Sequence, residues 1–85
     1  MRKPNGEYYS FEEWDEFLQG LTEEQLREAE LETIEDLEIL QRRMISDRIQ
    51  RNLESYPSNL RIYELLSTQL GMLRDEKLRR SGNAS

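Results

Sequence analysis

The chain has 85 residues and a net charge of −6, and hydrophobic and charged residues each make up 35% of it. A chain of this length forms one small domain, and this composition suits thin amphipathic helices better than a thick core. It contains no histidine and no cysteine, which excludes the commonest proton shuttle and metal ligand, thiolate metal sites and disulfides. We therefore expect no catalytic residue, no metal site and no cofactor, and we do not expect an enzyme.

Residues 1–8 contain Pro, Asn and Gly, which are typical of turns, so this segment is predicted to be a flexible arm. It lacks the apolar region that follows the basic residues of a secretory signal. Because the chain has no long apolar run, we expect no membrane span and a cytoplasmic protein. Residues 9–80 are predicted to form a single helical domain, and residues 81–85 a disordered tail.

The first predicted helix covers residues 11–19. Ser10 precedes it and Glu13 follows three residues later, which is the pattern of a capping box, where each side chain bonds to the other's backbone N–H. Gly20 follows the helix and is expected to end it in the left-handed conformation common at helix C-termini.

The apolar side chains of this helix allow three interpretations. Phe11, Trp14 and Leu18 have the spacing with which an amphipathic helix enters a partner's groove. The second interpretation, which the caps at Ser10 and Thr22 and the short link favour, is that the same side chains cover the apolar stripes of this chain or of a second copy. The third is a helix that becomes ordered only on binding. Under the first interpretation the partner-binding residues are Phe11, Trp14, Phe17, Leu18, Glu12, Glu13, Asp15 and Glu16.

A long second helix is predicted over residues 23–55, where Thr22 and Gln25 form a second capping box. It is expected to end before Pro57, which disfavours helical geometry in its predecessor. A third helix is predicted over residues 59–79, with Gly71 as a weak point that permits close approach of a neighbour. A short turn between two long helices favours an antiparallel, coiled-coil-like hairpin.

The apolar stripes of the long helix are broader than the seam of a two-stranded coiled coil. Two helices alone do not cover such stripes, so we expect oligomerisation, most simply a homodimer, to complete a helical bundle. The residues predicted to form the oligomer interface are Leu26, Leu37, Leu40, Met44, Ile45, Ile49 and Leu53. The predicted fold class is therefore all-α, with a short N-terminal helix and a long antiparallel hairpin.

Charge is divided unevenly along the chain. Residues 1–38 hold thirteen acidic and three basic residues, and residues 39–85 hold five and nine. In a hairpin that turns near Pro57, the basic and acidic segments face each other, which selects orientation more than it stabilises. The expected partners are Arg74, Lys77, Arg79 and Arg80 on one side and Glu32, Glu35, Asp36 and Glu38 on the other.

These features predict a function in binding. The first hypothesis is a protein-protein interaction module, such as an adaptor, a chaperone-like protein or a regulatory subunit. The alternative is an acidic inhibitor, of the kind phages use, whose carboxylates imitate nucleic-acid charge and block a basic site on an enzyme. Direct nucleic-acid binding is disfavoured, because the chain is acidic overall and its arginines are spread around the helix.

Overall fold

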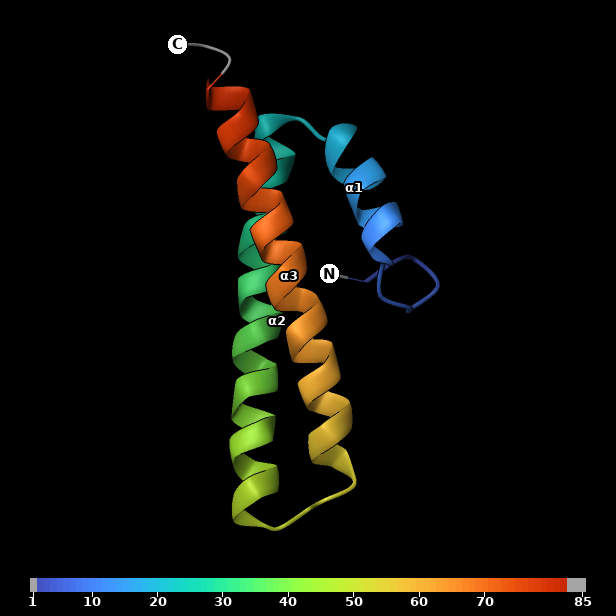
Figure 1. Ribbon diagram of the computed structural model, residues 1–85, viewed down its shortest axis with the longest axis vertical. Coiled ribbons are helices and arrows are strands. Elements are labelled where there is room, and N and C mark those ends of the chain that lie inside the picture. The colour runs from blue at the N-terminus through green and yellow to red at the C-terminus, as the bar shows by residue number, and fades with distance from the viewer. Residues whose placement is uncertain (1, 83–85) are drawn as a thin grey trace.

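The computed structural model describes residues 2–82, which form three helices: α1 (Phe11–Gln19), α2 (Glu23–Ile49) and α3 (Ser55–Gly82). Helices α2 and α3 form a long antiparallel hairpin, and α1 lies beside the end of the hairpin where α2 begins and α3 ends (Figure 1). The predicted all-α class and helical hairpin are confirmed. Of the predicted C-terminal tail, Ser81 and Gly82 belong to the last turn of α3, and residues 83–85 lie outside the described residues.

Both predicted capping boxes are present. The backbone N–H of Glu13 donates to Ser10 Oγ at 3.2 Å, and the N–H of Ser10 donates to the Glu13 carboxylate at 3.1 Å. The N–H of Gln25 donates to Thr22 Oγ1 at 3.1 Å, and the N–H of Thr22 donates to Gln25 Oε1 at 2.9 Å. Each box satisfies two backbone N–H groups, one of which lies in the first turn of the helix and has no intrahelical acceptor. The starts of α1 and α2 are therefore determined by local sequence.

The turn of the hairpin comes earlier than predicted, because α2 ends at Ile49 and α3 begins at Ser55. Arg51 adopts a left-handed conformation with φ of 56°. Its N–H donates to the Arg48 carbonyl, and the N–H of Asn52 donates to the Asp47 carbonyl at 2.8 Å. These two bonds form a Schellman motif at the end of α2. Pro57 then lies inside the first turn of α3, where its missing N–H leaves no intrahelical bond unmade.

The earlier turn changes the pairing of charges between α2 and α3. Arg74 and Lys77 both pair with Glu30, at 3.6 and 3.2 Å. Arg79 and Arg80 pair with Glu76 of their own helix. The predicted pairing of these four basic residues with carboxylates from Glu32 to Glu38 was therefore wrong in register, although the basic end of α3 does face the acidic start of α2.

Arg51→Gly is expected to stabilise the protein by about 0.5–1 kcal/mol, because glycine adopts positive φ without the steric cost that arginine bears. Urea denaturation followed by circular dichroism measures the change. Gln50→Gly is the matched control: Gln50 has φ of −85°, so glycine there relieves no strain and should lower stability. A destabilising Arg51→Gly would contradict the left-handed turn.

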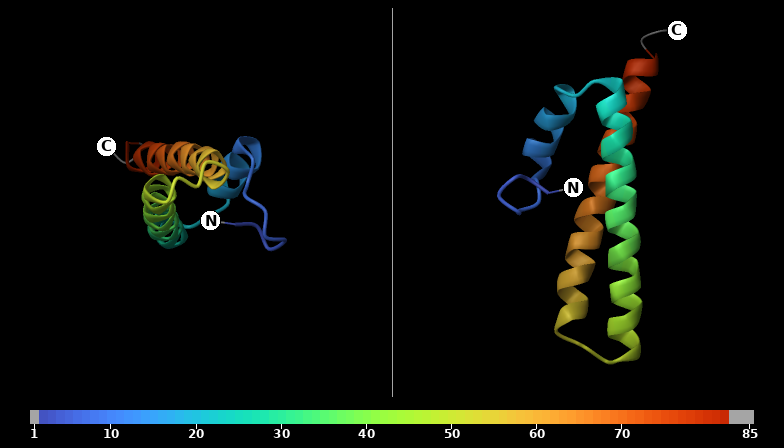
Figure 2. Two further views of the ribbon diagram at one scale, coloured as in Figure 1. Left: turned by 90° about the horizontal axis from the view of Figure 1, so that it is seen from below. Right: turned by 180° about the vertical axis from the view of Figure 1, so that it is seen from behind.

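The hydrophobic core cluster lies where all three helices meet. Its fully buried apolar side chains come from every helix and are Trp14, Leu18, Leu26, Ala29 and Leu73. Beyond the N-terminal end of α1 the hairpin continues toward its turn as two helices only, as Figure 1 and the right view in Figure 2 show. Gly71, predicted to permit close approach of a neighbour, lies at the surface, and a Cβ there would have no atom within 4 Å.

Candidate protein-binding surface

The segment before α1, predicted to be a flexible arm, adopts a closed turn in the structure. The N–H of Lys3 donates to the Glu7 carbonyl at 2.7 Å, and Gly6 reverses the chain with φ of 87°. The Lys3 ammonium reaches the Glu13 carboxylate at 2.9 Å. This turn is therefore tied to the first turn of α1.

Trp14 attaches the middle of α1 to the hairpin. Its side chain is fully buried, and its indole Nε1–H donates to the backbone carbonyl of Gln69 in α3 at 2.9 Å. The rings of Tyr9 and Phe17 form a three-ring cluster with it, with centroids 5.4 and 5.5 Å from that of Trp14. Leu18, one turn further on, is also buried. Trp14 and Leu18 thus lie in the core of their own chain, and a role for them at a partner surface remains a prediction.

Gln69 is a second attachment point, which the sequence pattern did not predict. Its buried side-chain amide donates from Nε2 to the Tyr9 carbonyl at 2.7 Å, just before α1 begins. The sequence carries only a weak signal for this role, namely an amide side chain at an otherwise apolar position between Leu66 and Leu73. A buried amide is costly unless it is hydrogen-bonded, so this bond helps to define the position of α1.

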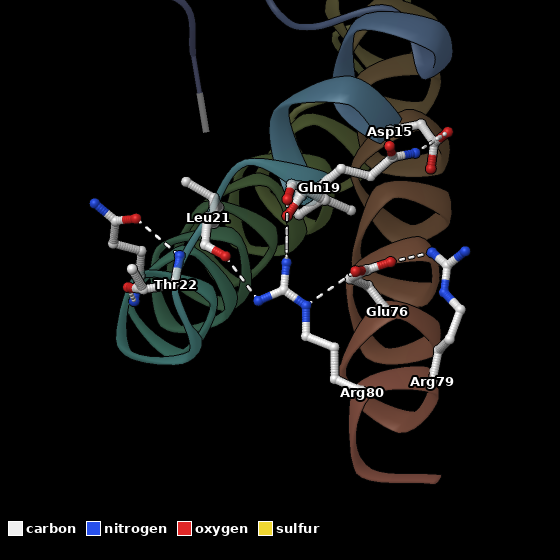
Figure 3. A network of polar contacts seen from close by, with 9 residues as sticks. Asp15, Gln19, Leu21, Thr22, Glu76, Arg79 and Arg80 are labelled. Carbon is white, nitrogen blue, oxygen red and sulfur yellow. Dashed lines mark hydrogen bonds and ion pairs between the residues drawn. The ribbon is translucent and has the colours of Figure 1, made fainter. Parts of the chain in front are cut away.

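Arg80 attaches the C-terminal end of α1, as Figure 3 shows. Its guanidinium donates to the carbonyls of Leu21 at 2.7 Å and Leu18 at 3.0 Å, with a longer contact to Gln19 at 3.4 Å. Its Nε donates to the Glu76 carboxylate, one turn earlier on α3, at 3.0 Å, and this bond orients the Arg80 side chain. A cation at this position also interacts favourably with the negative end of the helix dipole.

Glu76 is buried on α3 and accepts hydrogen bonds from both Arg80 and Arg79. The hydrogen bond from Arg80 is the largest influence on this carboxyl and, together with Arg79, holds its pKa below the ordinary value of 4.5. Glu76 is therefore charged at neutral pH and orients the guanidinium that binds α1.

Gly20 ends α1, but not in the left-handed conformation that we predicted. Its φ and ψ are −87° and −3°, in the right-handed region. A left-handed cap residue serves to satisfy the last carbonyls of a helix with backbone N–H groups. In this protein the N–H groups of Gly20 and Leu21 donate to the carbonyls of Phe17 and Leu18 at 3.3 and 3.2 Å, and the guanidinium of Arg80 donates to those of Leu18 and Gln19. The positive φ is therefore not required.

Gly20→Ala is therefore expected to stabilise the protein by about 0.4–1 kcal/mol, by restricting the unfolded chain without straining the folded one. The added Cβ would meet only the Phe17 carbonyl, at an ordinary contact distance of 3.8 Å. Thermal and urea denaturation measure the change. Gly6→Ala, at φ of 87°, should be destabilising in the same assay. Equal loss at both positions would show that Gly20 needs the left-handed conformation after all.

The outer face of α1 is the side turned away from Trp14 and Leu18. We define it by Glu12, Asp15 and Glu16, and Phe11 lies at its edge, next to the buried side; all four residues are exposed. Phe11 keeps 47% of its surface accessible. Among the ion pairs of residues 2–82, none includes these three carboxylates. The outer face therefore carries three charges not neutralised by a neighbouring cation, with one accessible ring at its edge.

The other predicted partner-binding residues on α1 are already engaged within the chain. Phe17 is half-buried and stacks on Tyr9 with centroids 4.8 Å apart. Glu13 binds Lys3 and the cap residue Ser10, and these bonds, the one from Lys3 first, lower its pKa to about 2. The predicted set is thus divided between residues that hold α1 in place and residues that face solvent.

The predicted oligomer-interface residues divide in a similar way. Leu26 and Leu40 are buried, and Leu37 and Met44 are half-buried. The remaining three stay largely exposed, at 54% for Ile45, 77% for Ile49 and 80% for Leu53. The hairpin therefore uses one part of the predicted interface internally and leaves the other part at the surface.

Two further observations concern residues 2–82. No group of three or more carboxylates in this range lies close enough together to hold a metal ion. None of the helices formed by these residues has the length and apolar character needed to cross a membrane.

The fold and this surface define a class of small helical protein: an antiparallel hairpin that carries a short, anchored acidic helix. Comparisons with models of protein families, with curated proteins and with solved structures find no match for the chain.

Proposed function

We propose that the chain is a small cytoplasmic protein-protein interaction module, an adaptor or regulatory subunit, that presents the outer face of α1 to a basic protein. The observation that supports this proposal is the attachment of α1. Trp14 and Arg80 bind it to the hairpin at its middle and at its end. The carboxylates of Glu12, Asp15 and Glu16 are thereby held on the solvent side of a fixed helix.

A fixed helix suits recognition, because a partner does not have to order it on binding and the associated loss of conformational entropy is avoided. The three carboxylates favour a partner whose surface is basic, through electrostatic steering and charge-assisted hydrogen bonds. Phe11, exposed at the edge of the same face, offers an aromatic anchor of the kind enriched at interface centres. Charge and ring together fit a basic surface with a small apolar recess.

A charge-matched pair of variants tests the proposal. The first, Glu12→Gln/Asp15→Asn/Glu16→Gln, removes three negative charges from the outer face of α1. The control, Glu54→Gln/Glu64→Gln/Asp75→Asn, removes three exposed negative charges elsewhere. Both variants and the native chain are immobilised, exposed to extract from the source organism, and the retained proteins are quantified by mass spectrometry.

The native chain and the control should retain the same protein, and the outer-face variant should lose it by about tenfold or more, equivalent to 1.4 kcal/mol. Phe11→Ala should weaken retention in the same direction. Equal retention by the two triple variants would exclude the outer face of α1 as the binding surface. Circular dichroism spectra of all variants establish that the loss is not one of folding.

A second candidate is an acidic inhibitor that imitates the charge of a nucleic acid. Glu23 and Glu24 in the first turn of α2 are exposed, and they follow α1 closely in the chain. Together with the outer face of α1 they give a series of carboxylates at one end of the molecule. Under this proposal a duplex nucleic acid should compete with the chain for its partner, and binding should weaken steeply with salt. Undiminished binding in excess duplex would favour the interaction module.

A further inference from the structure

Helix α2 carries an exposed apolar surface on the side that faces away from α3. Leu31, Ile45 and Ile49 are 57%, 54% and 77% exposed. With Ile34 and two charged residues they occupy an arc of roughly 80° at 3.6 residues per turn. We call this surface the outer stripe of α2, and its members are Leu31, Ile34, Glu38, Arg42, Ile45 and Ile49.

No helix of the described chain covers the outer stripe. The side of α2 that contributes to the core is the opposite one, on which Leu26, Ala29 and Leu40 are buried. Helix α1 contributes Trp14 and Leu18 to the same core and packs mainly against α3, beside which it lies in Figure 1. Large apolar side chains gathered on one exposed helix face are typical of a site for another helix.

The outer stripe has nearly the same arrangement when read from either end. Leu31 and Ile49 lie nine residues before and after Leu40, and Glu38 and Arg42 lie two before and after it. Ile34 and Ile45 are similarly placed, six before and five after. The stripe is thus self-complementary: apolar positions match apolar positions, and an acidic position matches a basic one.

We infer that the occupant of the outer stripe is a second copy of this chain, bound antiparallel about a two-fold axis near Leu40. In that arrangement Leu31 lies beside Ile49 of the second copy, and Ile34 beside its Ile45. Glu38 of each copy lies beside Arg42 of the other. A two-fold axis repeats every contact, so one favourable pairing is formed twice. The two hairpins together make a four-helix assembly.

Charge determines the orientation of the two copies. A parallel arrangement would put Glu38 against Glu38 and Arg42 against Arg42, which is repulsive. The antiparallel one also sets the acidic half of α2, with Glu32 and Glu35, along the basic half, with Arg43 and Arg48. Exposed ion pairs of this kind select orientation and register, while the apolar contacts supply affinity.

This dimer uses a surface different from the outer face of α1, so it goes beyond the proposed function and is tested separately. Sedimentation equilibrium of the full chain, from low micromolar to near-millimolar concentration, should show a reversible monomer-dimer equilibrium. Ile45→Glu should shift it to monomer. Ile39→Glu is the matched control, because Ile39 is a comparably exposed isoleucine of α2, at 47%, outside the stripe. It should leave the dissociation constant within about threefold of the native value.

A charge swap tests the register. Glu38→Arg and Arg42→Glu alone should each raise the dissociation constant by about tenfold, because each sets like charges against each other in both copies. The double variant Glu38→Arg/Arg42→Glu should restore dimerisation, since the pairs are re-formed with opposite sign. A native chain monomeric at every concentration, an Ile39→Glu variant as disruptive as Ile45→Glu, or a double variant without recovery would each overturn the inference. Circular dichroism verifies that each variant is helical.

Discussion

Replacing Trp14 by alanine is expected to destabilise the folded chain by about 3–5 kcal/mol, the range typical of large aromatic residues removed from a core. The side chain is fully buried at the junction of the three helices, and its indole N–H is bonded to the Gln69 carbonyl. Small domains are stable by only about 5–15 kcal/mol, so this change removes much of the total. Urea denaturation followed by far-UV circular dichroism measures the loss.

Trp14→Phe separates the contribution of the ring from that of the hydrogen bond. Phenylalanine keeps an aromatic ring beside Tyr9 and Phe17 but lacks the indole N–H. It should cost about 1–2 kcal/mol, because the Gln69 carbonyl, inside a helix, retains its intrahelical bond.

Unchanged stability in Trp14→Ala would mean that α1 is not part of the core. The interpretation of α1 as a ligand for a foreign groove would then replace the present one.

The second large effect is expected at Arg80. Arg80→Met keeps an apolar stem of similar length and removes the guanidinium. The Leu21 carbonyl then loses the Arg80 donor, the Leu18 carbonyl keeps only the N–H of Leu21, and Glu76 loses one of two cations. Removing one partner of a buried charge pair costs about 3–5 kcal/mol. The Arg80 side chain is 25% exposed and Arg79 remains on Glu76, so we expect a smaller loss, about 2 kcal/mol. Denaturation monitored by circular dichroism reports it.

Arg80→Lys is the matched control, because it keeps the charge but not the planar fork that reaches several acceptors at once. It should recover part of the lost stability and not all of it. Full recovery would show that charge alone matters and that the carbonyl contacts drawn in Figure 3 contribute little.

The effect of Arg80→Met should also depend on pH. The pKa of Glu76 is held below 4.5 in the folded chain, with Arg80 as the first cause. A carboxyl with a depressed pKa contributes stability that is present above its ordinary pKa and is lost as pH falls through the folded value. The difference in unfolding free energy between native chain and variant should therefore shrink on going from neutral pH to strongly acidic pH. A constant difference would indicate that Glu76 does not take part.

Local sequence signals predicted the beginnings of α1 and α2 correctly. Ser10 with Glu13 and Thr22 with Gln25 form the expected boxes, because a capping box is made of residues three apart. The end of α2 could not be predicted in this way, since the chain turns at Arg51, a residue with no special preference for left-handed geometry. Pro57, taken as the stop, is tolerated in the first turn of α3.

The candidate surface was predicted in composition but not in arrangement. The spacing of Phe11, Trp14 and Leu18 defined an apolar side and left the carboxylates on the other. The spacing could not predict which of these apolar residues stay accessible to solvent, because accessibility depends on where α1 lies on the hairpin. Contacts more than fifty residues apart, from Gln69 and Arg80, determine that position.

The sequence by itself determined an all-helical chain, its two capped helix starts and the antiparallel hairpin with charge-matched ends. These follow from propensities and pairings that act over a few residues or repeat along a helix. The tertiary structure alone decided that Trp14 closes the core of its own chain, that Gly20 needs no left-handed cap, and that the outer stripe of α2 stays uncovered. Each of these depends on which distant side chain arrives at a given place, and backbone carbonyls, which carry no sequence signal, are the acceptors that Trp14 and Arg80 bind.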